Sequence, residues 1–247
     1  MKKALILARR ELGGYFFSPM AYVIGALFLA ATAYLFFSGF PALNVPAVFI
    51  VGGEASLRQL FLDLGVLMVF TAPLLTMRLM SEEYRSGTVE TLTTAPITET
   101  EIILGKFLGV LAFYAALLAS TLVFLGLIIG YAQPDPGVAV MGYLGMLLLG
   151  AAFLSVGLFT SCITRYQILA ALVGVSVLSL FALLMQEIVG SRAPEVLREA
   201  ADQMNAMNWF RLFAKGVFDT RGVAYFLTGT ALFLFLSVKA LESRRWR

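Results

Sequence analysis

Long apolar segments without a charged residue constrain the fold of this chain more than any other feature. Residues 20–40, 107–131, 137–164 and 166–186 each contain no Asp, Glu, Lys or Arg. A membrane-spanning helix needs about 20 such residues, whereas a barrel strand needs about 9–11 of alternating polarity. Only 13% of the residues are charged, compared with about 25% in a soluble domain. We therefore expect an all-α polytopic membrane protein, because lipid accepts only helices and closed barrels as spanning structures.

Six apolar segments predict six spans within a single transmembrane domain of residues 1–247. The predicted spans are residues 20–40, 59–80, 107–131, 138–164, 166–186 and 222–238, with boundaries that are approximate by a few residues. The second and sixth segments are short, and they reach across a bilayer if the charged residues at their ends extend to the interface.

The distribution of basic residues predicts the orientation. With the N-terminus in the cytoplasm, 12 of the 18 Lys and Arg residues fall on cytoplasmic segments. The two short outer loops then carry only Arg58. Since basic residues gather on the cytoplasmic side, both termini are predicted to be cytoplasmic. The basic residues are spread over several loops and form no stripe, which argues against nucleic acid as a partner.

The first 17 residues predict a helix that lies in the inner membrane interface. Leu5, Leu12 and Phe16 recur at helical spacing, and Arg9 and Arg10 lie largely on the other side. The alternative is a short basic tail that only fixes the topology.

Residues 187–221 predict short outer helices before the last span. Leu197, Ala200 and Met204 form one apolar stripe, and Phe210 and Phe213 belong to a second. These helices either pack against the bundle or lie on lipid, and the sequence leaves both possibilities open.

The sequence shows no motif that is typical of a catalytic, cofactor or metal site. Gly105-Lys106 is not a Walker A motif, because the glycine five residues earlier is absent and Phe107 replaces Ser or Thr. The chain has no His, and Cys162 is its single Cys. Asp63 and Arg78 are charged but lie near span ends, which disfavours an ion-coupled carrier. We expect no catalytic residue, cofactor site or metal site in this chain.

Residues 78–106 form a polar island between the second and third predicted spans. Ser81 is a candidate cap of a short polar helix, and Gly87 is a candidate break after it. Residues 88–94 are candidates for one or two further helical turns, which Pro96 ends. Thr98 opens a capping-box pattern before the third span. The island predicts a short helix turned across the membrane normal; the alternative is an ordinary connecting loop.

The string EEYRSGTVETLTTAPITETEIILGKFLG resembles the cytoplasmic signature of ABC-2 type ABC transporter permeases. The residues that carry the resemblance are Glu82, Glu83, Gly87-Thr88, Glu90, Leu92, Pro96 and Gly105-Lys106. The opening KKALILARRELGGYFFSPMAYV and the closing LESRRW are similar to the branch that contains gliding-motility-associated permeases.

The resemblance implies a permease subunit in a prokaryotic cytoplasmic (inner) membrane, most simply an exporter. It implies a second permease copy or a paralogue, an accessory membrane protein in some systems, and a separate ATPase subunit that binds ATP and Mg²⁺. It also implies that residues 82–96 form a coupling region seated on that ATPase. The implied coupling residues are Glu82, Glu83, Arg85, Gly87, Thr88, Val89, Glu90, Leu92 and Pro96.

Two other functions remain as alternatives. One is a non-transporting membrane component of a motility or secretion assembly, which the gliding-motility kinship favours. The other is an ion-coupled secondary transporter. The apolar span interiors favour a lipid-like or amphipathic substrate, but no motif identifies it.

Overall fold

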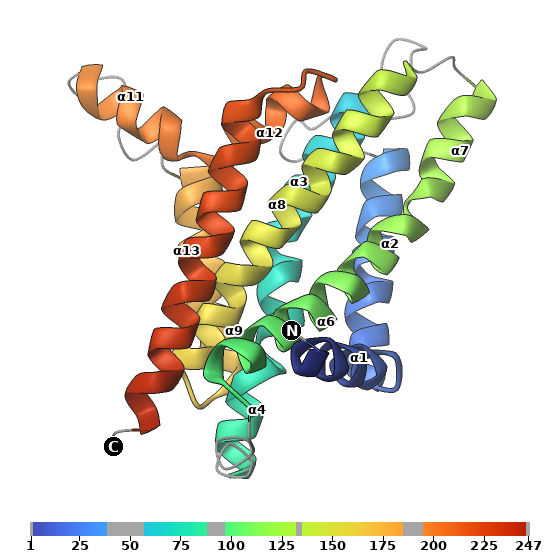
Figure 1. The fold of residues 1–247 in the computed structure, drawn as a ribbon. Coiled ribbons are helices and arrows are strands. Elements are labelled where there is room, and N and C mark those ends of the chain that lie inside the picture. The colour runs from blue at the N-terminus through green and yellow to red at the C-terminus, as the bar shows by residue number, and fades with distance from the viewer. Residues whose placement is uncertain (1, 39–56, 88–96, 132–134, 185–194, 246–247) are drawn as a thin grey trace.

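The computed structural model describes residues 2–38, 57–87, 97–131, 135–184 and 195–245, and all regular structure within them is helical (Figure 1). The prediction of an all-α chain is confirmed. The helices are α1 (Lys2–Phe16), α2 (Pro19–Ser38), α3 (Leu57–Thr76), α4 (Arg78–Ser86), α6 (Glu99–Ser120), α7 (Leu122–Tyr131), α8 (Pro136–Ile163), α9 (Gln167–Ser179), the π-helical turn η2 (Leu180–Leu184), α11 (Glu195–Met204), α12 (Ala206–Ala214) and α13 (Thr220–Arg245).

Five helical segments in the described parts of the chain are long and apolar enough to cross a membrane. They are Pro19–Ser38, Leu57–Ser86, Glu99–Gly130, Pro136–Ile163 and Thr220–Ser243. The segment predicted as the fifth span, residues 166–186, contains a shorter apolar helix, Gln167–Ala182. The chain is thus a multi-pass membrane protein, and the count of six spans stays a prediction.

The core lies where α3 and α8 pack along each other. These two segments bury a larger share of their residues than the other long helices do. Small residues on α8 allow close approach on two sides: Gly142 faces the ring of Phe61 on α3, and Gly150 faces the ring of Tyr114 on α6. The Tyr114 hydroxyl donates a hydrogen bond of 2.9 Å to the Met146 carbonyl, which satisfies a polar group that is fully buried.

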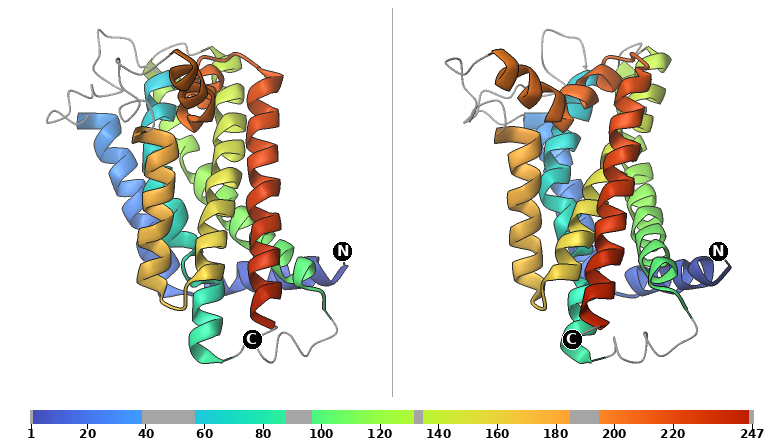
Figure 2. Two further views of the ribbon diagram at one scale, coloured as in Figure 1. Left: turned by 90° about the vertical axis from the view of Figure 1, so that its left-hand side faces the viewer. Right: turned by 60° about the vertical axis from the view of Figure 1, so that its left-hand side comes forward.

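The two ends of the bundle differ (Figures 1 and 2). The N-terminal helix α1, helix α4 and the C-terminal end of α13 lie at one end, and α11 and α12 lie at the other. Helix α12 packs into the bundle, because Phe210 and Phe213 are fully buried against α3 and α8. Helix α11 extends away from the bundle, and its Val196 is exposed. Of the two outer arrangements that the sequence left open, α12 adopts packing against the bundle.

Helix α1 packs along the N-terminal part of α6 and lies crosswise to α3, α8 and α13 (Figure 2). The contact is close because glycines on α6 face α1. A Cβ at Gly105 would lie 2.8 Å from the Leu7 Cβ, and a Cβ at Gly109 would lie 2.7 Å from the Glu11 Cβ. A glycine four residues from another permits such backbone approach between helices. This small-residue pair therefore joins two helices of the same chain.

We expect Gly105→Ala to destabilise the protein by about 1–3 kcal/mol, the usual effect of overpacking. The new methyl group would meet both Leu7 and the carbonyl of Ala4, which lies 2.9 Å away. The matched control is Gly126→Ala on α7, where no atom lies within 4 Å of the added Cβ. Unfolding of both variants in detergent micelles gives the comparison. Equal stability of the two variants would contradict the close α1–α6 contact.

Candidate coupling site at the junction of α1, α4 and α6

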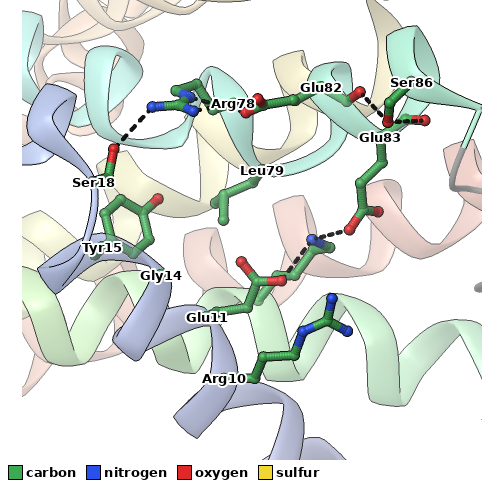
Figure 3. Close-up of a pocket in the computed structure, with 11 residues that line it drawn as sticks. Arg10, Glu11, Gly14, Tyr15, Ser18, Arg78, Leu79, Glu82, Glu83 and Ser86 are labelled. Carbon is green, nitrogen blue, oxygen red and sulfur yellow. Dashed lines mark hydrogen bonds and ion pairs between the residues drawn. The ribbon is translucent and has the colours of Figure 1, made fainter.

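The centre of the junction is Lys106, a charged side chain in a buried position. The residue is 1% exposed, and it begins the apolar part of α6. Its ammonium group donates hydrogen bonds to Glu83 Oε1 on α4 at 2.7 Å and to Glu11 Oε1 on α1 at 3.0 Å. Side chains of three helices therefore meet at one cation, and Glu11 and Glu83 point toward each other there (Figure 3). A buried charge is tolerated when it is paired in this way.

A second set of polar contacts ties the end of α1 to α3 and α4. Arg78 forms an ion pair of 2.9 Å with Glu82 along α4 and also donates to the Ser18 hydroxyl at 3.0 Å. Tyr15 donates a hydrogen bond of 2.7 Å to the Leu75 carbonyl. Burial raises the pKa of the Tyr15 hydroxyl, and the nearby Glu11 carboxylate raises it further. Tyr15 therefore remains a neutral hydrogen-bond donor at physiological pH.

Between these contacts the junction encloses an open hollow of about 320 Å³. Its lining combines residues from the three helices: Arg10, Glu11, Gly14, Tyr15, Ser18, Arg78, Leu79, Glu82, Glu83, Ser86 and Lys106 (Figure 3). Three basic and three acidic side chains contribute to it, so the lining is strongly polar without an excess of either charge. Such a lining suits contact with protein or water more than contact with hydrocarbon.

Helix α4 continues α3 beyond a one-residue interruption at Met77. The Met77 backbone keeps helical angles, with φ −55° and ψ −28°. The Ser161 hydroxyl on α8 supports this point: it accepts hydrogen bonds of 3.1 Å from the Met80 and Ser81 amides and donates one of 3.1 Å to the Met77 carbonyl. One hydroxyl thus uses its donor and both acceptor positions at the start of α4.

One expectation about the island is wrong, and another lies outside the described residues. Ser81 does not cap a helix: it lies buried inside α4 and donates a hydrogen bond back to the Met77 carbonyl. The contacts of Ser161 explain the difference, since they hold the first turn of α4 in line with α3. Helix α4 prolongs the Leu57–Ser86 segment toward the end where α1 lies (Figure 1). The short helix predicted to turn across the membrane normal falls after Gly87, and residues 88–96 lie outside the described residues. The capping box at Thr98 is confirmed, with Thr98 and Glu101 bonded reciprocally.

We expect Ser161→Ala to cost about 1–3 kcal/mol of stability, because two buried amides would lose their acceptor. The matched control is Ser176→Ala on α9, where an exposed hydroxyl only donates to its own helix. Thermal unfolding in detergent micelles measures both. A Ser161→Ala protein as stable as the control would show that the hydroxyl does not hold α4 in line.

The structure places only part of the residues predicted for coupling. Glu82 and Glu83 are both on α4, but they pair with different residues: Glu82 with Arg78, and Glu83 with Lys106. Arg85 is exposed, and Gly87 ends α4 in a left-handed conformation with φ 73°. Thr88, Val89, Glu90, Leu92 and Pro96 lie outside the described residues.

The residues predicted for the interfacial helix all lie on α1. Leu5 and Phe16 are exposed, as are Arg9 and Arg10, and Leu12 packs partly against the core. The exposed face of α1 therefore mixes apolar and basic side chains, which is typical of a helix at a membrane surface.

The sequence model of ABC-2 family transporter proteins matches residues 19–238. The chain belongs to the ABC-2 transporter family. The family predicted from the polar island is therefore confirmed, and with it the assignment of the chain as a membrane permease component. Permease domains of this family are generally non-catalytic, and they work with an ATPase subunit. A comparison with curated proteins gave no match.

Within this ABC-2 protein, the sequence did not identify Lys106, Glu11 and Ser161 as residues of the junction. The sequence did contain a sign that Lys106 is unusual, because it is a single cation directly before a long uncharged run. No sequence feature marked Glu11 or Ser161, since their roles depend on which helices the fold brings together.

Proposed function

We propose that this chain is the permease subunit of an ATP-driven exporter, and that its α1–α4–α6 junction faces a separate ATPase subunit. The single observation that supports the proposal most is the polar junction at one end of an apolar bundle. Its charged side chains lie at the end where α4 extends past the level of α1 (Figure 2).

The proposed orientation places this end in the cytoplasm. The basic residues favour it, and α1, α4 and the end of α13 share that end. Residues 82–96 then form the coupling region, beginning on the last turn of α4 and continuing past Gly87. The exposed side chains of Arg85 and Ser86 are available to a partner there.

The sequence contains no Walker A motif, so in the proposed complex ATP hydrolysis in the partner moves the permease through contact. The proposed complex contains two permease chains, as copies or paralogues, with ATP and Mg²⁺ bound by the ATPase subunits. An amphipathic or lipid-like substrate fits the apolar character of the long helices, and export is the direction that the family resemblance favours.

Co-purification tests the proposal. The chain is tagged and expressed in its native host, and its complex is purified in mild detergent. We expect an ATPase subunit in equal number, ATP hydrolysis by the complex, and no hydrolysis by the permease alone. A chain that carries a substrate along an ion gradient without any ATPase would overturn the proposal.

A further inference from the structure

The charge cluster at the junction has a consequence beyond docking. We propose that Lys106 is a positioning residue that makes α1 move together with α4 when the ATPase displaces α4. This inference rests on the proposed function, because it takes the ATPase as the source of the movement.

Helix α1 is attached firmly to α6 and only locally to α4. The glycines at 105 and 109 bring the backbones of α1 and α6 into direct contact, and α1 packs along α6 rather than along α4. The hollow separates α1 from α4, since residues of both helices line it. Among the described residues, the polar links between α1 and α4 run through Lys106 and, beside Ser18 just after α1, through Arg78.

Lys106 is suited to transmit a displacement because it holds two carboxylates that repel each other. Without a cation between them, Glu11 and Glu83 would separate, since like charges at short range in a poorly solvated site are strongly unfavourable. The ammonium has three donors and uses one on each carboxylate. Moving Glu83 with α4 therefore pulls on the same group that holds Glu11.

The site is also shielded enough for the link to persist. The Lys106 side chain is 2% exposed, and the side chains of Glu11 and Glu83 are 22% and 20% exposed. By contrast, the Lys239–Glu242 pair on α13 joins side chains that are 54% and 38% exposed. Exposed pairs contribute little and exchange readily with water, so the two sites form a matched comparison.

Distance measurements between spin labels test the inference on the purified complex with its ATPase subunit in lipid nanodiscs. One pair of labels, at Arg9 on α1 and Arg85 on α4, reports whether these helices move together. The three label positions used in the two pairs, Arg9, Arg85 and Ser243, are all exposed. A second pair, at Arg85 and Ser243 on α13, reports whether α4 moves at all. The native Cys162 is buried and does not compete for the label.

We expect ATP with vanadate to shift the Arg85–Ser243 distance and to leave the Arg9–Arg85 distance unchanged. Glu83→Gln removes the carboxylate charge on the α4 side, leaves only a weaker neutral acceptor there, and keeps the Lys106–Glu11 pair. In this variant the Arg9–Arg85 distance should also shift with nucleotide. Lys106→Arg should keep the native pattern, because it preserves the cation. Glu242→Gln, the same change in an exposed pair, should keep it as well.

The outcomes separate the two proposals. If nucleotide moves α4 but the Arg9–Arg85 distance shifts in the native chain, or stays fixed in Glu83→Gln, the inference about Lys106 is wrong and the ATPase coupling stands. If no ATPase subunit binds, or nucleotide moves neither distance, the proposed function fails first.

Discussion

Leu92→Asp is expected to release the ATPase subunit from the permease or to leave it bound without nucleotide-driven movement. A buried apolar anchor in an interface typically contributes at least about 2 kcal/mol, so a carboxylate in its place should weaken the complex by about 30-fold or more. Glu90→Arg should act in the same direction, because it reverses a charge that faces a basic partner in the proposed interface. The measurement is the yield of ATPase subunit that co-purifies with each variant, together with ATP hydrolysis by the complex.

The matched control is Glu99→Arg, the same substitution at the first residue of α6. This position lies just outside the coupling region, so association and hydrolysis should stay close to those of the native complex. The level of each variant in the membrane shows whether the bundle still inserts. If both Leu92→Asp and Glu90→Arg bind the ATPase and hydrolyse ATP like the native chain, residues 88–96 are only a connecting loop.

Lys106→Met is expected to cause the largest loss of stability among the substitutions considered. Removing one partner of a buried ion pair costs about 3–5 kcal/mol, because the remaining charge is left uncompensated. Glu11 and Glu83 retain about one fifth of their exposure, so water relieves part of the repulsion and the expected loss lies near the lower value. Denaturant titration in mixed micelles gives the free energy of unfolding.

Lys239→Met provides the comparison for this second prediction. It removes the same cation from an ion pair of the same length, 2.7 Å, but at an exposed position of α13. Exposed pairs contribute about 0–1 kcal/mol, so this variant should unfold almost like the native protein. Similar losses in Lys106→Met and Lys239→Met would mean that the junction is solvated and contributes no more than a surface pair.

Much of the fold was predictable because the bilayer makes the apolar pattern decisive. A long uncharged run such as residues 137–164 is expected to cross lipid as a helix, and α8 (Pro136–Ile163) occupies nearly the same residues. The capping box at Thr98 was predictable for a similar reason, since it depends only on side chains within one turn. Gly87 was singled out as a break, and it does end α4.

The junction was less predictable because its contacts join residues far apart in the chain. Serine is a common helix cap, so Ser81 was a candidate for that role. In the structure, the Ser161 hydroxyl on α8 accepts from the Ser81 amide, donates to the Met77 carbonyl, and keeps α4 in line with α3. Glu83 pairs with Lys106 because the fold brings together two residues that are 23 positions apart in the chain. No local pattern distinguishes such a glutamate from a surface one.

In the proposed complex, the α1–α4–α6 end of the bundle binds an ATPase in the cytoplasm. Site-specific photo-cross-linking in intact cells tests this binding. The cross-linker is placed at Val89 and, as a control, at Arg198 in the segment before α13. We expect the cross-linker at Val89 to capture an ATPase subunit and the one at Arg198 not to. An impermeant label added outside the membrane should reach a cysteine at Arg198 and not one at Val89. Capture of an ATPase from Arg198, or labelling of Val89 from outside, would contradict the proposed complex.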